Sequence, residues 1–566
     1  MTTLSGASLR RVFFALLAFG LLTVATGASP VLAQSSPPGE GEGRFGVIES
    51  YEDPEAAGRL GAAWTRVRFQ WADVQAEGPE AWALPLEDED LAIELAAGRE
   101  VAGLIIGIPD WARDRNGLPR GLDLPPDDPG NTWAVFVRDL VDRYDGRINH
   151  WIIWNEPDIA DADAPGHTWD GSMEEFFQLQ KTAYLVAKET NPEAVIHLGA
   201  FTYFWDPGYF RRFLDLVATD PDAAENDYYF DIATAHLYFQ PGMIYNIIDL
   251  FYRAMAAYNL DQPIWLVETN APPMDDPYWL VPDWTLAVSL NEQAAFIPQA
   301  LATALAAGAE RVAVYKLKDT PGDRFANPEP FGLLRWDQSR RPAFDTYRVA
   351  IRRLEDVTTA ERERWDEVGQ IRLEQPGRTT TVLFARLPQS QTARVGATAD
   401  TAELVDMWGK TEIVDAEAGY FTVDLPGALC LHTIADYCMI GGTTYYLIQD
   451  LDYERPATPP PPTLAVTRPV PAGTPTPSPT PKEISPAPTP TATAMIIVAA
   501  VQSEPTLELI EEVTPNVETL ANEMETSLPA ADSISWVGNY AGFIFIGLVI
   551  LLAAAIVGRY LASSRG

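Results

Sequence analysis

Short apolar runs alternate with longer helical patterns from residue 45 to about residue 349. This rhythm is typical of βα units arranged around a parallel sheet. The pattern predicts eight strands, at residues 45–50, 64–69, 101–108, 150–154, 194–199, 230–237, 263–267 and 311–315. A final helix is expected at about residues 344–353.

The number of units favours one α/β architecture over another. Eight units over about 305 residues match a closed (β/α)8 barrel, or TIM barrel, for which about 250 residues is typical. A doubly wound dinucleotide-binding sheet is the alternative. It is disfavoured because Glu49 to Pro54 follow the first strand where a glycine-rich phosphate turn would stand. We therefore expect a barrel domain at residues 45–355.

The pattern changes after the barrel to short runs in which apolar and polar residues alternate. This change predicts a small antiparallel β domain, a β-sandwich, at residues 360–450. Its role is open between packing against the barrel and binding carbohydrate. The runs that carry the prediction begin at residues 370, 379, 402, 420 and 443.

The N-terminus has the features of an export signal. Arg10 and Arg11 precede an apolar stretch, and Val31-Leu32-Ala33 before Gln34 is typical of a cleavage site. We therefore expect a signal peptide at residues 1–33. The arginine pair also leaves a twin-arginine export route open.

The C-terminal region predicts a tether. Residues 451–534 form a linker, rich in Pro and Thr at first and acidic later, which cannot build a core and is expected to be an extended, disordered stalk. The following 536–560 segment contains an uncharged run of 18 residues, 540–557, close to the lower limit of about 17 for a transmembrane helix. Arg559 and Arg565 beyond it predict a cytoplasmic C-terminus. The barrel is then expected at the cell surface, outside the membrane.

Composition excludes several classes of partner. The formal net charge is −39, which argues against nucleic acid because phosphate binding needs a basic surface. The histidines and the only two cysteines, Cys430 and Cys438, show no metal-ligand spacing. We therefore predict no metal and no cofactor. Whether the two cysteines form one bridge or remain two thiols is open.

Candidate chemistry lies where polar residues follow apolar strands, because active sites of such barrels lie at the C-terminal ends of the strands. Asn155 and Glu156 follow the fourth strand, and Glu268 follows the seventh. Alternation along the sixth strand sends His236 and Tyr238 to the same side. Apolar surroundings can raise the pKa of a strand-end carboxyl toward that of a proton donor. Two facing carboxylates would form an acid/base and nucleophile pair.

The fourth-strand run WIIWNEPD at residues 151–158 resembles the motif of retaining (β/α)8 glycoside hydrolases, whose catalytic glutamates lie on strands four and seven. The chain is most similar to glycoside hydrolase family 39, and next to family 5. The resemblance extends to residues 173–199 and to FGLLRWDQSRRPAFDTY at residues 331–347. It implies hydrolysis of O-glycosidic bonds in an oligo- or polysaccharide.

The resemblance also implies residue roles. Glu156 would be the acid/base and Glu268 the nucleophile, while Asn155 would bind the sugar 2-hydroxyl. The other positions support them: Arg66 near the nucleophile, His236 and Tyr238 lining the site, and Trp111 offering a stacking face. The glutamates' carboxyl groups would then lie about 5 to 5.5 Å apart.

Some residues depart from the family pattern and leave the substrate open. Thr269 and Asn270 follow the second glutamate where relatives have an aromatic residue or glycine, and Lys316 follows strand eight where relatives place aromatics. Lys316 would either favour an acidic sugar or form an ion pair with a loop carboxylate. We prefer the second interpretation. A tethered glycan-binding protein without turnover and a transglycosylase are the functional alternatives.

Overall fold

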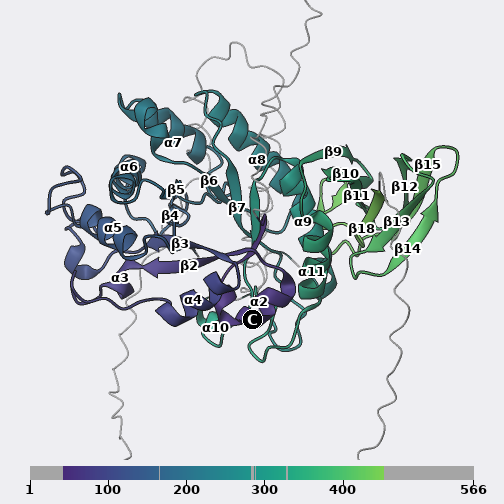
Figure 1. Ribbon diagram of the computed structural model, residues 1–566, viewed down its shortest axis with the longest axis horizontal. Helices are drawn as coiled ribbons and strands as arrows, with labels where there is room; N and C mark the ends of the chain where they lie inside the picture. Colours follow the sequence, from purple (N-terminus) through teal and green to yellow (C-terminus); the bar gives the residue numbers. More distant parts are fainter. Residues whose placement is uncertain (1–42, 165, 282–285, 287, 327–328, 451–566) are drawn as a thin grey trace, which may run out of the picture. The chain divides into compact units, whose positions relative to one another are not determined.

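The computed structural model describes residues 43–450, apart from 165, 282–285, 287 and 327–328 (Figure 1). The expected signal peptide, stalk and transmembrane segment lie outside the described residues. Within the described ranges, no helix is long and apolar enough to cross a membrane.

Eight parallel strands form the expected barrel. They are β1 (Phe45–Val47), β2 (Trp64–Gln70), β3 (Glu100–Ile106), β4 (His150–Ile153), β5 (Val195–His197), β6 (Ala233–His236), β7 (Ile264–Thr269) and β8 (Arg311–Val314). Their order is β5-β4-β3-β2-β1-β8-β7-β6. Parallel bridges from His197 to Ile232 and from Phe201 to Ala235 join β5 to β6. The sheet therefore closes on itself, and the prediction of a (β/α)8 barrel is confirmed.

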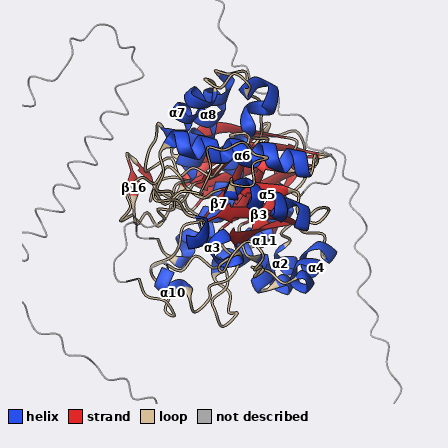
Figure 2. Ribbon diagram, turned by 90° about the vertical axis from the view of Figure 1, so that its left-hand side faces the viewer, coloured by secondary structure: helices blue, strands red, loops and turns tan. Residues whose placement is uncertain are grey.

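Helices surround these strands, which lie at the centre of the view in Figure 2. The α-helices are α2 (Pro54–Leu60), α3 (Trp71–Val74), α4 (Asp88–Ala96), α5 (Thr132–Arg143), α6 (Met173–Thr190), α7 (Tyr209–Val217), α8 (Pro241–Ala256), α9 (Leu290–Ala306), α10 (Asp323–Ala326) and α11 (Pro342–Leu354). Short 3-10 helices are η1 (Ser50–Glu52), η2 (Asp110–Ala112) and η3 (Ala223–Tyr229).

Local sequence fixes where the two longest described helices begin. Ser172 and Glu175 form a capping box at α6, and Ser289 and Glu292 form another at α9. In each box the serine accepts a bond from a free backbone N–H while the glutamate accepts one from the serine N–H. Both helices thus begin directly after the loops that follow β4 and β7. Asn155 and Glu156 lie in the first of these loops, and Glu268 lies near the end of β7.

The second domain is antiparallel, as expected. Its six-stranded sheet has the order β14-β13-β18-β11-β10-β9, and β12 pairs with β15 while β16 pairs with β17. The strands are β9 (Thr359–Trp365), β10 (Val368–Gln375), β11 (Arg378–Ala385), β12 (Gln391–Gly396), β13 (Thr401–Asp406), β14 (Thr411–Asp415), β15 (Tyr420–Leu425), β16 (Thr433–Ile434), β17 (Tyr437–Cys438) and β18 (Tyr445–Asp450).

This β domain packs against α9 of the barrel. The Gln299 side chain donates to the Gly442 carbonyl and accepts from the Gly441 N–H, each at 3.0 Å. Gln299 is fully buried, so these bonds satisfy a polar group that would otherwise be costly to bury. Cys430 and Cys438 form a disulfide bond beside this contact, which decides between the bridge and the two free thiols.

Candidate active site

The loop after β4 places Glu156 at the C-terminal end of the barrel. The Glu156 N–H donates to the Ala200 carbonyl at 3.0 Å, and Asn155 forms a parallel bridge with Ala200. Trp154 and Glu156 have positive φ angles of 75° and 50°, a conformation that costs about 1–2 kcal/mol per non-glycine residue. The backbone thus turns sharply at the motif while remaining tied to the start of the loop after β5.

Glu268 lies on β7 among groups that favour its ionised form. Its Oε1 forms an ion pair with the Arg66 guanidinium of β2 at 2.5 Å. Its Oε2 accepts a hydrogen bond from the Tyr238 hydroxyl, also at 2.5 Å. The side chains of Arg66 and Glu268 are only 6% and 8% exposed, so both charges depend on this pairing.

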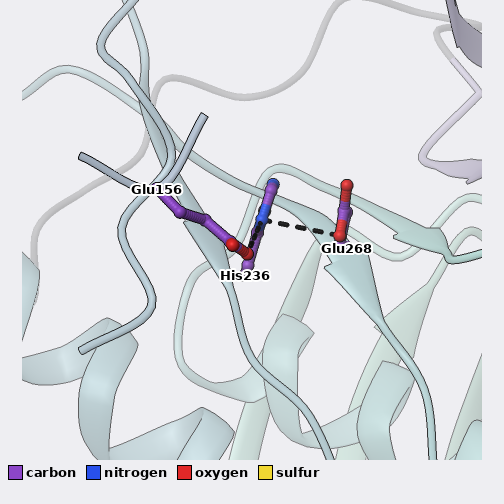
Figure 3. Close-up of side chains that lie close together, drawn as sticks. All are labelled: Glu156, His236 and Glu268. Atoms are coloured by element: carbon purple, nitrogen blue, oxygen red, sulfur yellow. Dashed lines mark hydrogen bonds and ion pairs between the residues drawn. The ribbon is translucent and has the colours of Figure 1, made fainter. Parts of the chain in front are cut away.

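His236 lies between the two glutamates (Figure 3). Its Nδ1 is 2.7 Å from Glu156 Oε1 and 3.5 Å from Glu268 Oε2. One oxygen of each carboxylate and a ring nitrogen lie within 4.8 Å of one another. The strand register contributes to this arrangement, since a shift after Ala235 sets His236 opposite Glu268 and such irregularities re-aim side chains.

The surroundings shift the pKa values of Glu268 and Tyr238 in opposite directions. Burial raises the pKa of Glu268, but neighbouring His236 and Arg66 and the bonds from Tyr238 and Arg66 outweigh it, so the net pKa is lowered. Burial and the negative charge of Glu268 raise the pKa of Tyr238 well above its ordinary value. At neutral pH Glu268 is therefore an anion, and Tyr238 is a hydrogen-bond donor.

The cluster also offers three ligand atoms to a metal ion, from Glu156, His236 and Glu268. The contacts of Glu268 argue against that use. An Arg66 nitrogen 2.5 Å from Glu268 Oε1 would repel a divalent cation, because two positive charges would then share one carboxylate. The absence of a metal and of a cofactor stays a prediction.

Two of the seven expected site residues lie outside this cluster of contacts. Asn155 adjoins Glu156, and its amide makes no hydrogen bond with another described residue. Trp111 lies in η2, where its ring nitrogen donates to the Gln75 carbonyl at 2.5 Å and its ring packs edge-on against Trp71. In the described ranges no hydrogen bond joins Trp111 to either glutamate, so its stacking role stays a prediction.

Lys316 is paired with carboxylates of the protein. Its Nζ lies 2.7 Å from Glu49 and 2.9 Å from Asp323, and the side chain is only 4% exposed. This agrees with the preferred reading of Lys316 as the partner of a loop carboxylate. The charge of Lys316 is therefore not a sign of an acidic sugar.

Sequence reasoning missed two residues that shape the loop after β4. Gly166 has a φ of +88°, and a Cβ there would lie 2.9 Å from Glu156 Oε2. Asp158 is buried and accepts bonds from the Thr202 N–H at 2.8 Å, the Thr202 hydroxyl at 2.9 Å and the Tyr203 N–H at 3.0 Å. The aspartate of the run WIIWNEPD, quoted only as part of a motif, thus clamps the loop after β5.

No protein-family model matches this sequence, and no curated protein matches it either. Solved structures do resemble it. A family 39 glycoside hydrolase from Bacteroides cellulosilyticus superposes with a TM-score of 0.53 at 16% identity, covering 72% of this chain and 82% of the hydrolase. This chain has the (β/α)8 fold of that hydrolase. A glucosidase from Croceicoccus marinus superposes with a TM-score of 0.50 at 13% identity, covering 74% of this chain and 98% of the glucosidase.

Proposed function

We propose that this protein is a retaining glycoside hydrolase, with Glu156 as acid/base and Glu268 as nucleophile. The observation that carries the proposal is the approach of their carboxylates, each with one oxygen in a cluster spanning 4.8 Å. Retaining enzymes hold the two carboxyl groups about 5 to 5.5 Å apart, and inverting enzymes about 6.5 to 9.5 Å. The short spacing supports a double displacement.

In the first step Glu268 attacks the anomeric carbon and the glycosidic C–O bond breaks. Glu156 gives its proton to the departing oxygen, and a glycosyl-enzyme ester forms on Glu268. In the second step Glu156 takes a proton from water as the water attacks the same carbon. The ester bond breaks, Glu268 leaves as carboxylate, and the sugar is released with its original configuration.

The neighbouring residues suit these steps. Arg66 and Tyr238 keep Glu268 ionised before attack and stabilise it as it leaves. His236 contacts both carboxylates and would hold their spacing. The Asn155 amide makes no hydrogen bond with another described residue, and it would bind the sugar 2-hydroxyl.

Two variants test the assignment through substrates with different leaving groups. Fluoride departs without a strong acid, whereas an alcohol needs a proton. Glu156→Gln should therefore slow the hydrolysis of an oligosaccharide about 100-fold or more. In the first turnover, it should slow the release of fluoride from a β-glycosyl fluoride much less. Glu268→Gln should abolish both reactions. The exposed Glu174→Gln on α6 is the matched control, and full activity in both site variants would refute the assignment.

The assay also separates the two functional alternatives. A (β/α)8 fold is also compatible with a glycan-binding protein. Such a protein would bind the glycan but release no product. A transglycosylase would transfer the glycosyl group from Glu268 to an added sugar in preference to water. Product analysis with and without an acceptor sugar distinguishes these outcomes from hydrolysis.

The proposed location is the outer face of a membrane. It is supported by the sequence of residues 1–33 and 536–560. The bond between Cys430 and Cys438 is also in keeping with export, because disulfides persist in oxidising compartments. Protease added to intact cells should degrade the barrel domain, and full protection in intact cells that is lost on lysis would refute this location.

A further inference from the structure

Two adjacent aromatic residues, Phe204 and Trp205, are exposed on the loop between β5 and α7. Their exposed fractions are 47% and 51%, and Trp205 is the most exposed tryptophan of the described residues. Most other described tryptophans are buried, many of them in the core. Exposed aromatic pairs are uncommon without a ligand or partner, because burial of such rings is strongly favourable.

The face of Trp205 is open to a ligand. It makes no ring contact, cation–π contact or hydrogen bond with another described residue. Exposed Trp336 differs, since the Arg324 guanidinium lies 4.7 Å from its ring centroid. Phe204 packs edge-on against Tyr203, with ring centroids 5.7 Å apart. The indole of Trp205 is therefore open to solvent, beside Phe204, which is held by its contact with Tyr203.

The base of this loop is fixed to the segment that carries Glu156. Asp158, two residues after Glu156, accepts three bonds from Thr202 and Tyr203. The Glu156 N–H itself bonds to Ala200 at the start of the same loop. Trp205 is only two residues beyond Tyr203, a reach of at most about 7 Å of chain. The loop that bears the aromatic pair is thus anchored at its base to the segment of the proposed acid/base.

The position relative to the reaction follows from the roles of the two glutamates. The acid gives its proton to the leaving oxygen, so the leaving group lies on the side of Glu156. Arg66 of β2 and Tyr238, which follows β6, contact Glu268, while His236 contacts both carboxylates. A group tethered to the β4 and β5 loops is therefore suited to meet the leaving portion of the substrate.

We propose that Phe204 and Trp205 form a stacking platform for a sugar ring on the leaving-group side of the scissile bond. The inference rests on the proposed hydrolase function. It names the substrate class as a glycan chain that continues beyond the cleaved bond, because an aromatic face binds the apolar C–H face of a sugar ring. A small non-sugar leaving group would gain little from this platform.

The test compares substrates with and without a leaving sugar. The probes are xylohexaose and cellohexaose, and the β-xylosyl and β-glucosyl fluorides, which carry fluoride in place of any leaving sugar. Trp205→Ala should lower kcat/KM for the hydrolysed hexasaccharide about tenfold, as expected for the loss of one stacked ring. It should leave kcat/KM for the matching fluoride unchanged. Trp205→Phe should recover most of the loss because it restores an aromatic face.

Trp408→Ala is the matched control, since Trp408 is 44% exposed but lies after β13 in the β domain. An equal loss of kcat/KM on both substrates in Trp205→Ala would indicate a structural role and overturn the platform. An unchanged kcat/KM on the hexasaccharide would also overturn it. Binding of the hexasaccharides, measured by calorimetry, separates this inference from the hydrolase proposal. Binding that depends on Trp205 without turnover would retain the platform and reject the hydrolase. Neither binding nor turnover with any probe would reject both.

Discussion

Arg66 and Glu268 form a nearly buried ion pair at 2.5 Å that joins β2 to β7. Burial raises the pKa of Glu268, but His236, this pair and the bond from Tyr238 together lower it. Since a nucleophile must be ionised to attack, the pair should set the acidic limit of activity rather than only the stability of the barrel.

Replacement of this arginine should move that limit. Arg66→Gln removes the positive charge, so the pKa of Glu268 rises and the acidic limb of kcat/KM shifts to higher pH, by about one to two units. Arg66→Lys keeps the charge and should shift the limb less. Tyr238→Phe should move it in the same direction, because a hydrogen bond to the carboxylate is lost. A pH profile measured on a β-glycosyl fluoride checks this, and an unmoved limb in all three variants would contradict it.

A second prediction concerns Gly166, which faces Glu156, the proposed acid/base. Gly166→Ala adds a Cβ 2.9 Å from Glu156 Oε2, which forces the carboxylate or the loop to shift. We expect a roughly tenfold lower kcat on an oligosaccharide, which needs the proton, and a smaller effect on fluoride release. The kinetics of both substrates provide the measurement.

Gly146→Ala is the matched control for that variant. Gly146 also has a positive φ, of +70°, but nothing lies within 4 Å of the position that a Cβ would take. Both variants therefore carry similar backbone strain, of about 1–2 kcal/mol, and only one meets the proposed acid/base. Equal kinetic effects in the two variants would show that strain alone is responsible.

The barrel is predictable from sequence because most residues of its strands are apolar and buried. All eight runs became strands, with ends shifted by one to a few residues, as β6 (Ala233–His236) illustrates against the expected 230–237. The β domain is predictable for the same reason at strands such as β11 and β18. Edge strands β9 and β14 were missed, since their residues are mostly exposed or half-buried and lack an apolar alternation.

The candidate site divides along similar lines. The two glutamates and the His236 and Tyr238 pair follow from strand ends and alternation, which are local. The role of Asp158 depends on Thr202 and Tyr203, 44 and 45 residues away. The ion pairs of buried Asp276 with Arg335 and Arg341 span 59 and 65 residues. No local pattern encodes such contacts, so only the fold reveals them.

The disulfide bond gives a third prediction, on the β domain. The unfolded, unreduced protein should contain no reactive thiol, because both cysteines are bonded. The bond closes a loop with a separation of 8 residues, so replacing both cysteines by serine should lower the free energy of unfolding by about 2–3 kcal/mol. Thiol titration and urea unfolding test the two statements. Two titratable thiols in the wild-type protein would contradict the first.

Asp158 gives a fourth prediction, on pH and stability. Burial raises the pKa of Asp158 to about 6, although the bonds from Thr202 and Tyr203 oppose the shift. Between its ordinary value of 3.8 and about 6, the folded protein binds a proton that the unfolded chain has lost. Folding therefore gains most from this group below about pH 4, and the contribution declines as pH rises through the folded pKa. The decline amounts to about 3 kcal/mol at most.

Asp158→Asn tests this linkage without removing the clamp, because the amide oxygen can still accept from Thr202 and Tyr203. Urea unfolding between pH 4 and pH 7 should show a flatter decline in the free energy of unfolding for Asp158→Asn than for the wild-type protein. The exposed Asp163→Asn should retain the wild-type slope. Since the clamp holds the loop of Phe204 and Trp205, the variant should also keep normal hexasaccharide kinetics at neutral pH. An unchanged slope in Asp158→Asn would mean that another group carries the proton.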